Sequence, residues 1–75
     1  LPEGEVEEEE LARIIRFCIE HLPPKLASVF ILKLIDEAES EEVCKELDIT
    51  ASNLWVMLHR ARLRMRKCVE SNWMN

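Results

Sequence analysis

Basic side chains are concentrated near the carboxyl end of this 75-residue chain, on a segment with helical periodicity. The apolar residues of this segment recur at steps of three and four: Leu54, Leu58, Ala61 and Met65. Its cations fall outside that apolar stripe: Arg60, Arg62, Arg64, Arg66 and Lys67. A helix with this division of residues buries one face and can lie along nucleic-acid phosphates, to which guanidinium and ammonium groups bind.

A turn and a shorter helix precede the basic helix. Ser40 is the expected cap of the short helix, because a serine hydroxyl accepts hydrogen bonds from the free amides at a helix start. The residues that the short helix buries are Val43, Cys44 and Leu47. At Asp48 the chain must turn, and a left-handed backbone is expected there. Thr50 can cap the basic helix. These features together predict a helix-turn-helix.

The first turns of the basic helix carry the side chains that are expected to be exposed. Ser52 and Asn53 lie on the leading turn, which enters a major groove first in a helix-turn-helix protein. Because the buried stripe is already defined, Trp55 and Val56 point outward and Met57 lies at the margin of the stripe. Exposed apolar groups of this size need a partner or a cover.

Two earlier helices are expected to support this unit. The apolar stripe of the first consists of Leu11, Ile14, Ile15, Cys18, Ile19 and Leu22. Pro23 and Pro24 end it, and the second helix begins at about Pro24 or Lys25, since proline suits the first turn of a helix. The apolar arc of the second helix contains Leu26, Val29, Phe30, Lys33 and Leu34. Residues 36–39 are acidic and poorly periodic, which indicates a connection.

Composition favours an all-α fold. Hydrophobic residues make up 48% of the chain, but aromatic residues only 5%, and there is a single glycine, so helices packed on helices are expected rather than a sheet with tight turns. A chain of 75 residues is one small domain without room for an enclosed active site. We therefore predict a four-helix, all-α domain with a helix-turn-helix over residues 9–70.

Charge is divided unevenly along the chain. Residues 1–49 carry 5 Lys and Arg against 14 Asp and Glu, whereas residues 50–75 carry 5 against 1. The local field decides nucleic-acid binding, so the overall pI of about 5.0 does not exclude it. Residues 1–8 are expected to be a disordered acidic linker and residues 71–75 a C-terminal tail. Without an initiator Met, the chain is expected to be a fragment of a longer protein.

Neither a metal site nor catalysis is expected from the sequence. The cysteines Cys18, Cys44 and Cys68 form no C-x-x-C pair, and the chain has no signal peptide and no membrane-length apolar run, so buried thiols without a redox role in a reducing cytoplasm are expected. His59 and His21 add too few ligands for a zinc site, and no cofactor is predicted. The carboxylates lie on helix surfaces and no glycine-rich loop is present, so the chain is not expected to be an enzyme.

Three segments carry a family resemblance: LPPKLASVFILK (22–33), SEEVCKELDIT (40–50) and NLWVMLHRAR (53–62). They resemble the C-terminal domain, region 4, of bacterial RNA polymerase sigma factors, and in particular those of the extracytoplasmic-function (ECF) group. The motifs are L-P, V-F-x-L and L-H-R-A-R at matching spacing, and the resemblance covers about residues 9–70. It implies four helices of the sigma region 4, winged-helix-like type. It also implies that the last helix reads the promoter minus-35 element in the major groove, and that partners include the β-flap of core RNA polymerase and an anti-sigma factor.

The chain departs from the family pattern at two places. Asp48 stands where the family usually has Gly, and Trp55, Val56 and Met57 stand where it usually has Lys, Ser and Arg. Without those cations, base readout is expected from the leading turn and from Val56 against a thymine methyl, with His59 and Arg60 nearer the DNA backbone. The complete predicted DNA-binding set is Thr50, Ser52, Asn53, Trp55, Val56, His59, Arg60 and Arg62.

Two other functions remain open on the sequence alone. The exposed apolar residues and the acidic first half are also typical of a domain that is captured mainly by an anti-sigma factor or by the polymerase flap. The helix-turn-helix domain of a response regulator also has four helices, although the L-P and L-H-R-A-R motifs disfavour it. Membrane association is not expected.

Overall fold

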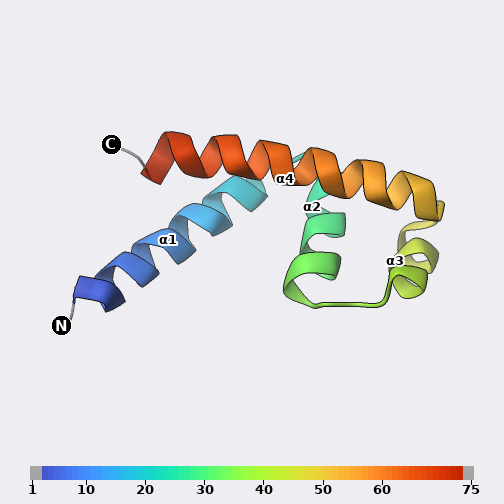
Figure 1. The fold of residues 1–75 in the computed structure, drawn as a ribbon, viewed down its shortest axis with the longest axis horizontal. Coiled ribbons are helices and arrows are strands. Elements are labelled where there is room, and N and C mark those ends of the chain that lie inside the picture. Colours follow the sequence, from blue (N-terminus) through green and yellow to red (C-terminus); the bar gives the residue numbers. More distant parts are fainter. Residues whose placement is uncertain (1–2, 74–75) are drawn as a thin grey trace.

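A computed structural model describes residues 3–73 of the chain, and the residues that it describes form helices joined by short connections (Figure 1). The elements are α1 (Glu3–Glu20), α2 (Pro24–Phe30), the π-helical segment η1 (Ile31–Ile35), α3 (Ser40–Leu47) and α4 (Ala51–Trp73). No strand occurs in this part of the chain, which confirms the all-α prediction. The molecule is elongated, with principal extents of 44 × 21 × 15 Å.

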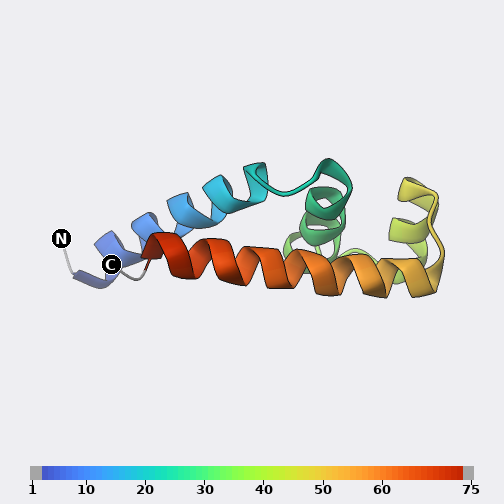
Figure 2. The same cartoon turned by 90° about the horizontal axis from the view of Figure 1, so that it is seen from above.

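The long helix α4 organises the fold. Both views show α4 running the length of the molecule, with α1 beside its C-terminal half and with α2 and α3 against its N-terminal half (Figures 1 and 2). Among the residues whose burial is described, half of the buried hydrophobic ones come from α4: Leu54, Met57, Leu58, Ala61 and Met65. The other five, from the preceding segments, are Cys18, Leu22, Leu26, Val29 and Val43. The predicted stripe on the last helix is confirmed.

Met57 differs from the prediction, which placed it at the margin of the stripe. Its side chain is only 7% exposed and belongs to the core. Because Met57 lies three residues after Leu54 and four before Ala61, it continues the buried face of the helix. A flexible thioether side chain also fills an irregular space between helices readily.

Helix α1 begins earlier than expected. The structure has helix from Glu3 onward, whereas the sequence predicts a disordered linker over residues 1–8; residues 1–2 lie outside the described residues. Glutamate is a good helix former, and acidic side chains are favourable near the positive end of a helix dipole. Residues 71–73, predicted to be a tail, continue α4, and residues 74–75 lie outside the described residues.

The junction between α1 and α2 follows the proline rules. The last turn of α1 closes with hydrogen bonds from the His21 amide to the Cys18 carbonyl and from the Leu22 amide to the Ile19 carbonyl, each 3.1 Å long. Pro24 is the first residue of α2, where its missing N–H costs nothing, as predicted. The second helix then widens into η1, and the Asp36 amide closes it on the Ile31 carbonyl at 2.9 Å.

The turn between α3 and α4 has the predicted geometry. Asp48 adopts a left-handed backbone with φ 55° and ψ 54°, which ends α3. The Ile49 amide then donates to the Cys44 carbonyl at 3.0 Å, so a carbonyl at the end of the helix is satisfied. Thr50 caps α4, because its Oγ1 accepts a 3.1 Å hydrogen bond from the Asn53 amide. The expected helix-turn-helix is therefore present.

The start of α3 differs from the prediction. The N-cap position is held by Glu39, which makes no side-chain cap hydrogen bond, and Ser40 is the first residue of the helix. The hydroxyl of Ser40 instead accepts a hydrogen bond from Lys33 Nζ at 3.2 Å. A tertiary partner has thus replaced the local capping contact that serine usually makes.

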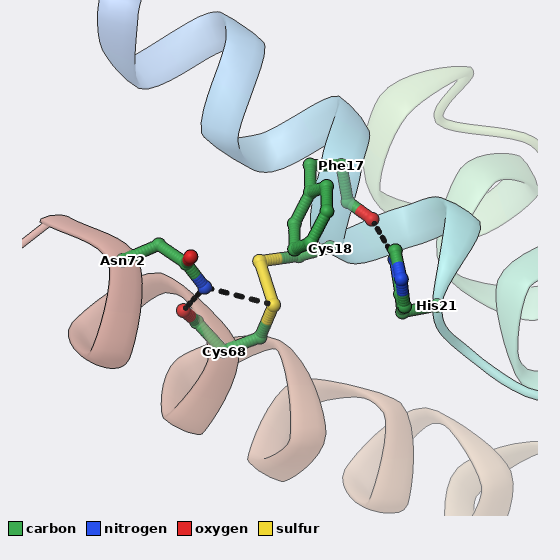
Figure 3. Close-up of a disulfide and its surroundings, with 5 residues drawn as sticks. All are labelled: Phe17, Cys18, His21, Cys68 and Asn72. Carbon is green, nitrogen blue, oxygen red and sulfur yellow. Dashed lines mark hydrogen bonds between the residues drawn. A yellow bond between two sulfur atoms is a disulfide. The ribbon is translucent and has the colours of Figure 1, made fainter.

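The cysteines also differ from the prediction of buried thiols. Cys18 of α1 and Cys68 of α4 form a disulfide across a sequence separation of 50 residues, with their Cα atoms 5.8 Å apart (Figure 3). Cys44 is the free cysteine of the described chain and is partly buried. The spacing of cysteines along the sequence does not indicate which of them meet, because the packing of α1 on α4 decides that distance.

Candidate nucleic-acid interface

All eight residues of the predicted DNA-binding set lie on α4 or on its cap, and all are exposed. Ser52, Val56 and His59 follow each other at steps of four and three residues, on the face opposite the buried stripe. Leu63 continues this face and is 49% exposed. The helix therefore presents one solvent-facing row of side chains, polar at its start and apolar at Val56 and Leu63.

The other members of the set lie on the two edges of this row. Asn53 and Arg60 are seven residues apart and share one edge, whereas Trp55 and Arg62 share the other. A guanidinium group thus stands on each side of the central row. This arrangement can contact a phosphate on each wall of a groove while the row between them meets base edges.

Lys33 of η1 lies beside Trp55, on one edge of the exposed row of α4. Its ammonium group donates hydrogen bonds to the Ala38 carbonyl at 3.1 Å and to Ser40 Oγ at 3.2 Å, and it lies 5.9 Å from the centre of the Trp55 ring. The lysine therefore joins η1, the start of α3 and the exposed indole of α4. Sequence periodicity places Lys33 only in the apolar arc of the second helix. Its contacts with Ala38, Ser40 and Trp55 join different elements, so the spacing of residues in the sequence does not indicate them.

Most of the cationic side chains of α4 are exposed to solvent. Arg60, Arg62, Arg64 and Lys67 are exposed, and the ion pair found in the described residues joins Arg66 Nε to Glu70 Oε2 at 3.4 Å. Both partners of that pair are well solvated, so it adds little stability. Between residues 50 and 69 the sequence contains no acidic residue, so the charged side chains of this stretch of α4 are all basic.

The described residues contain neither a cluster of metal-binding side chains nor a helix that could span a membrane. No cluster of three or more His, Cys, Asp or Glu side chains within them could hold a metal ion. Their buried side chains are all hydrophobic. None of the helices described in residues 3–73 combines the length and the apolar character that a membrane span requires.

Comparisons with known proteins agree with this geometry. Residues 12–65 match the family model of sigma-70, region 4. The chain is 39% identical over 67 residues to a probable RNA polymerase sigma factor of Haemophilus influenzae, covering 89% of this chain and 34% of that protein. It is 37% identical over 67 residues to the ECF RNA polymerase sigma factor SigW of Bacillus subtilis, covering 89% of this chain and 36% of that protein.

The chain thus spans about a third of the length of these curated relatives. No solved structure was found to match it. The family model covers the second half of α1, the helix-turn-helix and most of α4, which are the elements that build the core and the exposed row. The chain belongs to the sigma-70 region 4 family.

Proposed function

We propose that this chain is the promoter-reading domain of an ECF sigma factor, which binds the minus-35 element through α4. The observation that carries the proposal is the exposed row of Ser52, Val56 and His59 between two edge arginines, on a capped helix of a region 4 domain. The names of the two relatives, one a probable sigma factor and one an ECF sigma factor, support the same function.

The dimensions of α4 suit a major groove. A helix with its side chains is about 10 to 12 Å across, which matches a major groove about 12 Å wide, and the ten residues from Ser52 to Arg62 extend about 15 Å along the helix axis. The first turn would meet base edges, with the hydroxyl of Ser52 and the amide of Asn53 as hydrogen-bonding groups. The methyl groups of Val56 would pack on a thymine methyl, and Arg60 and Arg62 would bind phosphates on either side.

Polymerase and regulatory partners belong to the same proposal. Because the chain spans only about a third of its relatives, one domain is expected to act within a longer sigma factor. That protein would bring core RNA polymerase to the promoter, with a contact from this domain to the β-flap. An anti-sigma factor is the expected regulator.

The test titrates the full-length parent, in the presence of core RNA polymerase, into promoter DNA. Fluorescence anisotropy measures the binding at two salt concentrations. Promoter DNA with an intact minus-35 element should bind more tightly than DNA with a scrambled element. Changing Arg60→Ala and Arg62→Ala together should weaken binding and reduce the salt slope by about 2, since each neutralised phosphate contributes about 0.9. Arg66→Ala is the matched control, because that arginine lies one turn beyond the stretch from Ser52 to Arg62 that is proposed to meet DNA. Unchanged binding by the double variant would refute the proposal.

Exposed apolar groups on α4 support a second candidate, capture by an anti-sigma factor or by the polymerase flap. Trp55, Val56 and Leu63 are 55%, 45% and 49% exposed, which is unusual for large apolar side chains on one helix. For a domain of this kind, Trp55→Ala should weaken capture of the protein partner more than it weakens DNA binding. If Trp55→Ala instead weakens DNA binding more than it weakens capture of the protein partner, this candidate is wrong. The match of residues 12–65 to sigma-70, region 4, disfavours the alternative of a response-regulator domain.

A further inference from the structure

The disulfide between α1 and α4 lies in an asymmetric environment. Cys18 is 1% exposed and belongs to the core, whereas Cys68 is only partly buried. Figure 3 shows Asn72, one turn after Cys68, with its amide directed at that residue. Asn72 Nδ2 lies 2.8 Å from the Cys68 carbonyl oxygen and 3.7 Å from Cys68 Sγ, so it donates toward the sulfur of one cysteine of the pair.

A groove with two cations opens beside the same sulfur atoms. Arg64 and Lys67 line it together with both cysteines, and the remaining lining residues are His21, Leu22 and Ser71. Arg64 and Lys67 are exposed and precede Cys68 on α4. Cationic side chains attract anionic molecules into the groove, and the thiolate is the form of a cysteine that attacks a disulfide.

From these features we propose that Cys68 and Cys18 form a reversible redox pair that reacts with anionic low-molecular-weight disulfides. Cys68 is the attacking cysteine and Cys18 the resolving one. The basic groove of Arg64 and Lys67 takes the carboxylates of the incoming molecule, and the product crosslinks α1 to α4. The proposal does not depend on promoter binding.

The exchange balances in two steps. The Cys68 thiolate attacks one sulfur of the small disulfide, so a mixed disulfide forms on Cys68 and one small thiolate leaves. The buried Cys18, after losing its proton, attacks Cys68 Sγ, which forms the intramolecular disulfide and releases the second small thiolate. The two protons lost by the chain are taken up by the two small thiols. The chain is oxidised by two electrons and the small disulfide is reduced by two.

The crosslink lies away from the exposed row of α4. Cys68 follows the spacing of the buried stripe, and it is twelve residues beyond Val56, about 18 Å along the helix. Oxidation therefore fixes α1 on the C-terminal half of α4 and leaves the first turns of α4 open. Binding of DNA by α4 and crosslinking of α1 can then occur in the same molecule.

The test follows the reduced chain by time-resolved mass spectrometry after acid quench, in a Cys44→Ser background that removes the free cysteine. With oxidised glutathione as the probe, the chain with both cysteines should pass through a glutathione adduct on Cys68 and end as the intramolecular disulfide. Cys18→Ala should stop at that adduct. Cys68→Ala should react about tenfold more slowly, because Cys18 is buried. Excess dithiothreitol should reverse the crosslink.

Matched variants test the groove and the amide separately. Arg64→Gln with Lys67→Gln should slow the reaction with oxidised glutathione by about tenfold and leave the reaction with the cationic disulfide cystamine unchanged or faster. Asn72→Ala should slow both reactions. Far-UV circular dichroism of every variant checks that the helices remain.

Three results would overturn the proposal. The first is a folded chain that forms no intramolecular disulfide, and the second is an adduct that appears on Cys18 as fast as on Cys68. The third is equal slowing of both probes by the double glutamine variant. If Cys18→Ala loses its helices, the order of attack is read from the chain with both cysteines. The cysteine that carries glutathione at the earliest quench time is then the attacking one.

Discussion

Reducing the Cys18–Cys68 disulfide should remove a large part of the stability of this domain. The bond closes a loop across 50 residues, which contains α2, η1, α3 and most of α4. Loop-closure entropy for a span of this length stabilises the folded chain by about 4 kcal/mol relative to the uncrosslinked chain. A domain of 75 residues has a total unfolding free energy of roughly 4 to 11 kcal/mol. The reduced domain is therefore expected to be marginally stable.

The assay compares urea unfolding of the oxidised and reduced chain by far-UV circular dichroism. Cys44→Ser is introduced in both samples, so that no disulfide forms between molecules. With a denaturant slope of about 1 kcal/mol/M, reduction should lower the midpoint by about 3 to 4 M. A fall of less than about 1 M would refute the reasoning, because it would mean that the ends of the loop stay close in the unfolded chain or do not meet in the folded one.

Three further changes test the helix-turn-helix itself. Leu54→Ala should destabilise the oxidised domain by about 2 to 5 kcal/mol, because this side chain is 0% exposed; a cost below 1 kcal/mol would contradict its central position. Thr50→Ala removes the cap of α4 and should cost about 1 kcal/mol in urea unfolding, whereas Thr50→Ser should be nearly neutral. Asp48→Gly should raise the unfolding free energy by up to about 1 kcal/mol, since φ is 55° there; equal stability of Asp48→Val and the parent would argue against backbone strain at this turn.

Local rules were sufficient to predict much of the fold and the exposure of the candidate site. The spacing of apolar residues placed the buried stripe of α4, and the rest of that helix surface followed from it. The left-handed Asp48 and the Thr50 cap depend on residue type and on neighbours within a few positions. The exposed row is the complement of the stripe, so its members could be named without knowledge of the tertiary contacts.

What the sequence could not supply depends on contacts between elements. Cys18 and Cys68 meet because α1 packs along the C-terminal half of α4, and their separation of 50 residues carries no information about that packing. Ser40 is the first residue of α3 rather than its cap, and its hydroxyl bonds to Lys33. Lys33 was assigned to an apolar arc because its long side chain stands at an apolar position, although its ammonium group reaches polar partners.

The two halves of the long helix α4 have different partners. The N-terminal half is held by α2 and α3, which leaves the row from Ser52 to Leu63 open. The C-terminal half is held by α1 through the disulfide. Acidic residues end before Thr50 and return at Glu70, so every charged side chain of α4 ahead of Glu70 is basic. A change in the cysteine pair would therefore act first on the attachment of α1, and a reduced chain that stays folded would keep the charge and shape of the exposed row.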